Sequence, residues 1–225
     1  MEKKTATSTE YGEHGADGGS KKLQDVFKPK PWQIQEPEKA KIIFLSYDAN
    51  WDKDVEDERP EFFKETIEEY LTDGVKYVEN NWEKNKMIHT PMLKDFYKGG
   101  NGRKYHEKCQ KLFKELDFTL NDVKDVCFLE LLNVCTYGNT NMGKFKNMLR
   151  RSENVAHLKK IRKIFESEKF IYTPKGVKNT IIKDIELKKY DFNTENIRDY
   201  THLSYISSDD FNRLKIELRT FLGKT

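Results

Sequence analysis

A short apolar run that passes directly into an aspartate-rich segment limits the possible folds of this chain most strongly. The run is 42–45 (IIFL), and its branched and aromatic side chains predict a strand buried on both faces, as in a parallel sheet. Asp48 and Asn50 follow at once. Ligands of open α/β sheets bind beyond the carboxyl ends of the strands, where Asp48 is expected to lie. From this stretch alone, a turn without chemistry fits even better than a catalytic carboxylate.

The 225 residues suit one domain with a tail. Residues 1–26 are rich in Gly, Ser, Thr, Glu and Lys and are expected to form a disordered tail, because they cannot bury enough apolar surface to offset the entropy of ordering. The domain is expected to span 27–225. Its first segment, 27–37, holds three prolines and two aromatic residues, and should be an extended lead-in.

Apolar runs alternate with segments of helical periodicity along this domain. Strands are expected at about 40–46, 126–133, 169–173 and 200–207, and loops at 87–103 and 191–199. Helices are expected at 59–73, 75–83, 105–116, 144–151, 154–167, 176–182 and 209–222. This alternation predicts an α/β fold, a three-layer α/β/α sandwich around a short parallel sheet of roughly four strands.

Two details of this interpretation concern helix ends and packing. Asn121 is a plausible N-cap for a short turn, and Ser208 or Asp209 is expected to cap the C-terminal helix. The residues of that helix expected to face inward are Phe211, Leu214, Leu218 and Phe221.

Charge and cysteine content exclude few functions. The net charge is only +3 while 35% of residues are charged, so composition does not by itself indicate nucleic-acid binding. Basic clusters lie at 150–163 and 175–183, and helix surfaces are commonly this basic. The three cysteines match no zinc or iron–sulfur spacing, and Cys127 and Cys135 suit the core. We expect no metal, no cofactor and no membrane segment, and an intracellular (cytoplasmic or nuclear) monomer.

Polar residues lie at the ends of three of the expected strands. They are Asp48 with Asn50, then Asn133, then His202 with Ser204. Each has an ordinary explanation, since an Asn caps turns and a lone His is most often simply half-buried. Their joint occurrence at the ends of parallel strands nevertheless indicates a site.

These segments resemble the motifs of the uracil-DNA glycosylase superfamily. Residues 44–51 (FLSYDANW) stand against a strand followed by Gly-Gln-Asp-Pro-Tyr-His, and 130–133 (ELLN) against Leu-Leu-Leu-Asn. Residues 202–207 (HLSYIS) stand against His-Pro-Ser-Pro-Leu-Ser, and 170–176 is similar to the third strand of the family. The resemblance covers about 40–222. It implies a uracil-DNA glycosylase-like sandwich that flips a modified base out of DNA and excises it.

The resemblance implies a role for each matched residue. Asp48 would orient a water and stabilise the oxocarbenium-like sugar, a neutral His202 would donate to the departing base, and Asn133 would read its edge. Asn50 would also line the base pocket, and the stacking ring would be Trp51, Phe62 or Tyr137. DNA contacts would come from Ser46, Ser204, Tyr205, Ile206 and Ser207, with Ile206 as an aliphatic wedge beside an exposed Tyr205.

The departures from the family leave alternatives open. Asn50 replaces the Tyr that excludes the thymine methyl group, and both prolines of the last motif are missing. A glycosylase fold that binds nucleic acid or a protein without cleaving is therefore the second hypothesis. A metal phosphoesterase using Asp48, Asp52, Asp54 and Glu56 is a third, although no second acidic cluster accompanies these residues.

Overall fold

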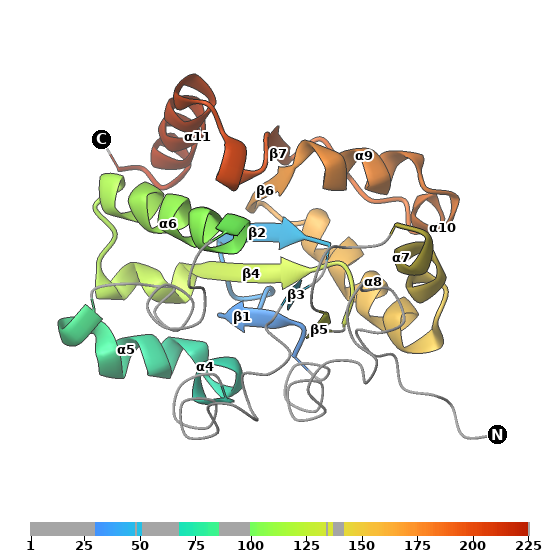
Figure 1. Ribbon diagram of the computed structural model, residues 1–225, viewed down its shortest axis with the longest axis horizontal. Helices are drawn as coiled ribbons and strands as arrows, with labels where there is room; N and C mark the ends of the chain where they lie inside the picture. The colour runs from blue at the N-terminus through green and yellow to red at the C-terminus, as the bar shows by residue number, and fades with distance from the viewer. Residues whose placement is uncertain are drawn as a thin grey trace.

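A computed structural model describes residues 30–47, 49–50, 68–85, 100–133, 135–136 and 142–224. At its centre is a five-stranded sheet in the order β1-β4-β2-β6-β7, in which only β1 is antiparallel to its neighbour (Figure 1). The strands are β1 (Trp32–Ile34), β2 (Ile42–Ser46), β4 (Val126–Glu130), β6 (Phe170–Pro174) and β7 (Ile197–Tyr200). A second parallel pair, β3 (Ala49–Asn50) and β5 (Cys135–Thr136), follows β2 and β4 along the chain. The expected number of roughly four parallel strands is confirmed by β2, β4, β6 and β7, and the first three lie where they were expected.

Side chains alternate between two cores on opposite faces of the sheet, as the pleat requires. Phe44 enters one core, where its ring stacks on Phe128 with centroids 5.0 Å apart and meets Phe113 edge-on at 5.6 Å. Leu45, one residue later, enters the other core. Because both faces are covered, the strand reads as a continuous apolar run in the sequence.

The helices divide between these two faces, which confirms the expected layers (Figure 1). The Phe44 face is covered by α4 (Glu69–Thr72), α5 (Gly74–Asn85), α6 (Gly100–Glu115), η4 (Leu120–Asp125), η5 (Leu203–Tyr205) and α11 (Ser208–Phe221). The Leu45 face is covered by α7 (Met142–Leu149), α8 (Ser152–Phe165), α9 (Lys175–Lys183) and α10 (Ile185–Lys188).

The expected fourth strand at 200–207 is wrong, because the strand lies earlier, at Ile197–Tyr200. Its middle residues are charged and paired: Arg198 Nε lies 3.2 Å from Glu217 Oε2, and Lys178 Nζ lies 2.7 Å from Asp199 Oδ1. A polar edge strand of this kind does not read as an apolar run, and 191–199 was therefore expected to be a loop.

Five smaller expectations also need correction. The lead-in contains β1, and α6 begins at Gly100 inside the expected loop 87–103. Thr119 rather than Asn121 precedes η4, where its N–H donates to Asp122 Oδ2 at 2.7 Å. Ser207 caps α11 in place of Ser208 or Asp209, because its Oγ accepts from the N–H of Asp210. Phe221 is 40% exposed at the helix end, whereas the other three inward residues are buried.

Candidate functional site

The order of the parallel strands fixes where a ligand crevice is expected. Across the sheet they lie in the order β4-β2-β6-β7, so the first parallel strand of the chain, β2, lies between the second, β4, and the third, β6. The chain therefore leaves β2 toward one side and later continues on the other side, and the order reverses between β2 and β6. Open α/β sheets bind ligands at this switch point, beyond the carboxyl ends of the strands. Here the Thr173 hydroxyl donates to the carbonyl of Leu45 at 2.9 Å, and the hydroxyls of Tyr47 and Thr180 are 2.8 Å apart. These bonds hold the end of β2 against β6 and α9.

His202 lies just beyond the carboxyl end of β7, at the start of η5. Its Nδ1 accepts a hydrogen bond of 3.3 Å from the N–H of Ser204. Burial lowers the pKa of the His202 imidazole below its ordinary value, so the ring is neutral near pH 7. A neutral ring that accepts through Nδ1 carries its hydrogen on Nε2. His202 is therefore neutral and presents an N–H donor at Nε2.

The surroundings of His202 keep it uncharged. The Tyr105 ring of α6 lies 5.2 Å from the imidazole, and burial raises the pKa of Tyr105 well above its ordinary value. Burial, with a smaller contribution from His202, lowers the pKa of His106 to about 3. The Tyr172 hydroxyl donates to the carbonyl of Thr201 at 3.1 Å and so fixes the turn before His202. Both imidazoles consequently stay neutral at physiological pH.

Asn133 lies three residues beyond β4 and is 7% exposed. Its N–H donates to Asn154 Oδ1 of α8 at 3.1 Å. His157, one turn further along α8, donates from Nε2 to the carbonyl of Glu130 at 2.6 Å. The N–H of Leu131 donates to the carbonyl of Ser46 at 3.0 Å. The main chain at Asn133 is thus held between β2 and α8.

Asn133 and His202 occupy the same carboxyl edge of the sheet. Since β2 and β6 lie between their strands, the two positions are three strand spacings apart, about 14 Å. Asp48, Trp51 and Tyr137 lie outside the described residues, and Asn50 is described only as a main-chain partner of Thr136. Convergence of Asp48, Asn133 and His202 on one cleft stays a prediction.

The residues expected to contact DNA differ in their exposure to solvent. Tyr205 is 60% exposed, as expected. Ile206 is 6% exposed and belongs to the core together with Leu203, so its expected exposure is wrong. The 3₁₀ turn of η5 has three residues per turn, which brings positions 203 and 206 to one face. That three-residue spacing of apolar side chains was the available signal.

The serines expected to bind phosphate differ in their surroundings. Ser46 and Ser204 are partly buried at the carboxyl edge. Ser207 is exposed, and its hydroxyl accepts the N–H of Asp210 at 3.1 Å as the cap of α11. An exposed cap hydroxyl keeps its own hydrogen for a ligand.

Sequence reasoning missed several polar residues near this edge. Tyr105 and His106 approach His202 from α6, and His157 supports β4 from α8. Glu130 is 6% exposed and is in register with Ser46 on the adjacent strand, so both side chains point to the α6 face. An acidic residue inside the apolar run VCFLELL was the signal for Glu130.

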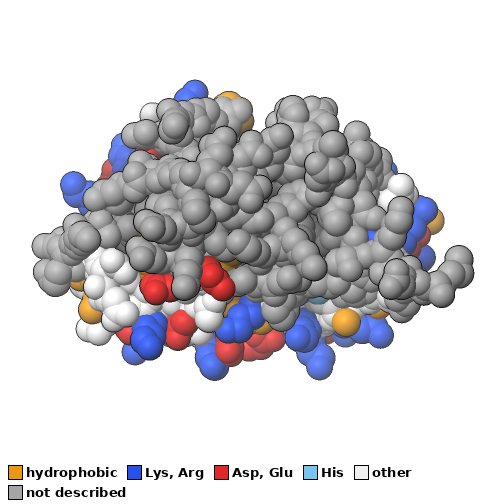
Figure 2. All heavy atoms as spheres, turned by 60° about the horizontal axis from the view of Figure 1, so that its bottom comes forward, with side chains coloured by type: hydrophobic (Ala, Val, Ile, Leu, Met, Phe, Trp, Pro, Cys, Tyr) orange, Lys and Arg blue, Asp and Glu red, His pale blue; other side chains and the backbone are white. Residues whose placement is uncertain are grey.

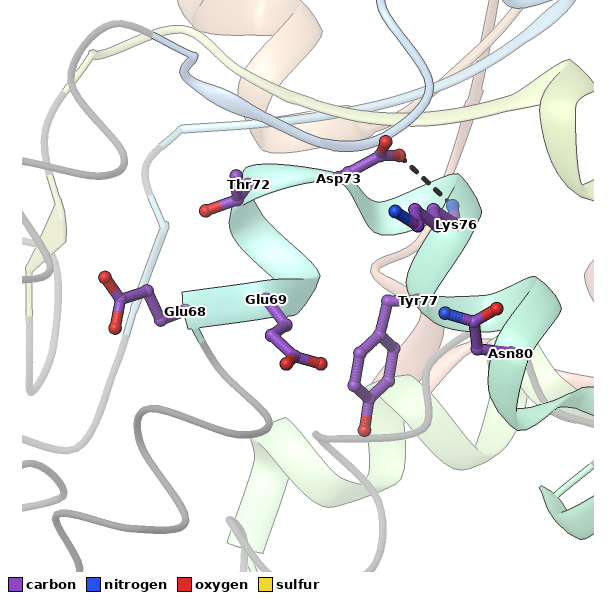
Figure 3. A pocket seen from close by; sticks show the side chains of 7 residues that line it. All are labelled: Glu68, Glu69, Thr72, Asp73, Lys76, Tyr77 and Asn80. Atoms are coloured by element: carbon purple, nitrogen blue, oxygen red, sulfur yellow. Dashed lines mark hydrogen bonds between the residues drawn. The ribbon is translucent and has the colours of Figure 1, made fainter.

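A separate hollow of about 510 Å³ lies between α4 and α5 (Figure 3). Its carboxylates come from Glu68, Glu69 and Asp73, and Lys76 and Tyr77 also line it. Asp73 Oδ1 accepts the N–H of Lys76 at 3.1 Å and so supports the start of α5. An acidic lining repels phosphate, so this hollow does not suit the nucleic-acid role implied by the motifs.

The charges of the described surface are of mixed sign. On the face in Figure 2, Lys and Arg side chains alternate with Asp and Glu side chains along the lower edge. Among the described residues, no group of three or more His, Cys, Asp or Glu side chains is arranged to hold a metal ion. Cys109 and Cys127 are buried free thiols. No helix within the described residues has the length and apolarity needed to cross a membrane.

The chain matches no protein-family model, and neither the curated proteins nor the solved structures compared with it include a significant match.

Proposed function

We propose that this protein is a DNA glycosylase that hydrolyses the N-glycosidic bond of a flipped-out uracil or other modified base. The observation that carries the proposal is the state of His202, a neutral imidazole at the carboxyl edge of a parallel sheet with its hydrogen on Nε2. Leaving-group stabilisation in this reaction requires such a donor. The sheet with helices on both faces, and Asn133 at the same edge, also support the proposal.

The proposed step uses three side chains and no metal. Cleavage leaves an oxocarbenium-like sugar and negative charge on the base. His202 Nε2–H donates to a base oxygen, where the charge develops, as a donor in an oxyanion hole does. The Asp48 carboxylate stabilises the sugar cation and orients the attacking water. Asn133 offers both a donor and an acceptor to the Watson–Crick edge of a pyrimidine.

Release of a base from oligonucleotides tests this proposal directly. Each of a panel of oligonucleotides carries one modified base, and cleavage at the resulting abasic site is measured. We expect wild type to act on at least one substrate, and both His202→Gln and Asp48→Asn to lose on the order of 10²-fold in rate. DNA affinity measured in parallel should change little. Undiminished excision by Asp48→Asn would contradict the mechanism.

Asn50 addresses the choice of base within this proposal. In the resembled family a Tyr at this place excludes the 5-methyl group of thymine, and Asn is too small to fill that volume. We expect the activation free energies for excision of uracil and of 5-hydroxymethyluracil to differ by no more than about 1–3 kcal/mol. Asn50→Tyr should restore preference for uracil. Strict uracil specificity in wild type would refute an open pocket.

One observation favours a second candidate, a glycosylase fold that binds nucleic acid or a protein without cleaving. Ile206, the expected wedge, is buried with Leu203 rather than presented to DNA. A protein of this kind would bind DNA with steep salt dependence and release no base from any oligonucleotide of the panel.

A further inference from the structure

A second groove, bordered by α7, α8 and α10, lies on the Leu45 side of the sheet. In Figure 1 these helices gather on the side toward which β2 and β4 point. The groove is about 750 Å³ in volume, and Leu149 and Val155 give it an apolar part. Four cations of the basic cluster at 150–163 line this groove, and the proposed chemistry leaves them unexplained.

Positive charge predominates in this groove. Its five cations are Arg150, Lys159, Arg162, Lys163 and Lys189. Only two carboxylates, those of Glu186 and Asp191, line it as well, so the net charge of the lining is +3. A hollow with this excess attracts anions and concentrates the field between its walls.

Existing ion pairs account for three of the five cations. Glu186 takes two of them, with Arg150 Nε 3.5 Å from Oε1 and Lys189 Nζ 2.8 Å from Oε2. Arg162 pairs with Glu166, the C-cap residue of α8, at 2.9 Å.

Lys159 and Lys163 have no carboxylate partner among the described residues. They are one helical turn apart on α8 and therefore lie on the same face, where like charges repel. Both are exposed. Two unpaired ammonium groups beside a groove suit two anionic groups of one extended ligand.

An aromatic ring lies beside these charges. Tyr190 lines the groove and is partly exposed, and its ring stacks on Phe192 with centroids 5.8 Å apart and planes at 27°. Phe192 in turn packs on Phe165 of the core, with centroids 5.2 Å apart. The Tyr190 ring is thus held in place on a fixed support. Cations next to a supported aromatic ring are the combination by which proteins hold a single nucleic-acid strand, because phosphates meet the charges and a base stacks on the ring.

The groove is connected to the main candidate site through α8. Asn154, in the first turn of this helix, bonds the main chain of Asn133. At about 1.5 Å per residue, Lys159 lies about 8 Å further along the helix axis and Lys163 about 14 Å. The groove and the carboxyl edge are therefore close enough for one strand to contact both.

We propose that the groove of α7, α8 and α10 binds the sugar–phosphate backbone of a single nucleic-acid strand, with Lys159 and Lys163 on phosphates and a base stacked on Tyr190. This inference rests on the proposed nucleic-acid function and adds a second contact region, away from the reacting base. The lysines position the strand and read no sequence.

Binding of an unmodified oligonucleotide tests the groove separately from catalysis. The affinity of the full chain for a fluorescein-labelled single strand is measured by anisotropy across a range of salt concentrations. We expect Lys159→Gln/Lys163→Gln to weaken binding on the order of 10-fold at about 0.1 M salt, and to flatten the log–log salt slope by about 1.4, from two lost contacts to a single strand.

The matched control removes two exposed lysines from the opposite, amino edge of the sheet. Lys114 lies in the last turn of α6 and Lys124 in the last turn of η4. The variant Lys114→Gln/Lys124→Gln therefore makes the same change in net charge. Its affinity should stay within about 2-fold of wild type. Tyr190→Leu should weaken binding by about 5-fold or more through lost stacking, whereas Tyr190→Phe keeps the ring and should bind as wild type.

Several results would overturn the groove assignment. Equal affinity of the two double variants is one, and absence of oligonucleotide binding by wild type is another. Wild-type binding to phosphatidylserine vesicles that is lost in Lys159→Gln/Lys163→Gln, with oligonucleotide affinity unchanged, would assign the groove to a membrane surface instead.

Comparison with the excision assay separates the two proposals. If the groove variant loses oligonucleotide binding and wild type releases no base, the groove proposal is supported and the glycosylase proposal is refuted. If wild type excises a base and the groove variant binds the oligonucleotide with wild-type affinity, only the groove proposal is refuted.

Discussion

His157 makes the stability of this protein sensitive to mild acid. The side chain is 7% exposed, and its Nε2 donates to the carbonyl of Glu130 at 2.6 Å. Burial lowers the pKa of this imidazole from 6.5 to about 4, with the hydrogen bond acting in the opposite direction as the smaller effect. Folding therefore requires the neutral ring, while the unfolded chain accepts a proton at an ordinary pKa.

The direction and size of the effect follow from linkage. Because the folded pKa is below the unfolded one, the unfolded state binds more protons between pH 6.5 and 4, and stability falls as the pH falls through this window. From pH 7 to pH 5 the contribution of His157 to the free energy of unfolding drops by about 2 kcal/mol, and by about 3 kcal/mol over the full window. A domain of ordinary stability has only about 5–15 kcal/mol.

Urea unfolding followed by circular dichroism at pH 7 and pH 5 measures this drop. Other groups, including His106 and His202, whose pKa values are also lowered, add to the loss in wild type. The comparison with His157→Gln isolates one imidazole, since glutamine keeps an N–H donor and does not titrate. We expect the variant to be less stable at pH 7, but to lose about 2 kcal/mol less than wild type on going to pH 5.

Equal losses in the two proteins would refute the reasoning. They would mean that His157 is protonated in the folded state, and that its ring is not the neutral donor to Glu130. A different slope of the unfolding free energy against urea concentration at the two pH values would mark a departure from two-state unfolding. Amide hydrogen exchange of β4 would then replace the urea measurement.

Three further predictions concern stability and can be checked by urea unfolding at pH 7. Gly74→Ala should destabilise by about 1–3 kcal/mol, because a Cβ there would lie 2.7 Å from the main chain of Ile34. Thr173→Val should cost about 1–3 kcal/mol by removing the donor to a buried carbonyl of β2; an unchanged midpoint would contradict this. Ile206→Ala should cost about 2–5 kcal/mol if this residue is core, whereas an exposed wedge would leave stability unaffected.

The buried layers of the fold were predictable because their physics is local. Runs such as 42–45 are apolar on both faces, and few structures other than a covered parallel strand bury them. The strands at the edges of the sheet were not predictable in this way. At β7 the charged Arg198 and Asp199 find partners on α11 and α9, elements that a local reading of 197–200 does not include.

The candidate site shows the same division. His202 and Asn133 were predicted as residues at strand ends, and in the structure both lie just beyond the carboxyl end of a strand. Tyr105 and His106 were missed because α6 reaches this edge only through tertiary packing. The neutral state of His202 was expected from the resemblance, and its cause in the structure is burial, which lowers the pKa of the imidazole.

The two outer strands of the described sheet also affect how copies of this protein meet one another. Exposed strand edges invite pairing with another chain, and short or charged edges discourage it. β1 has only three residues, and β7 carries Arg198 and Asp199 at its centre, each with an ion-pair partner on a neighbouring helix. An incoming strand would have to align against a charged edge only four residues long. At high concentration, aggregation through these edges should therefore be slow while the domain stays folded.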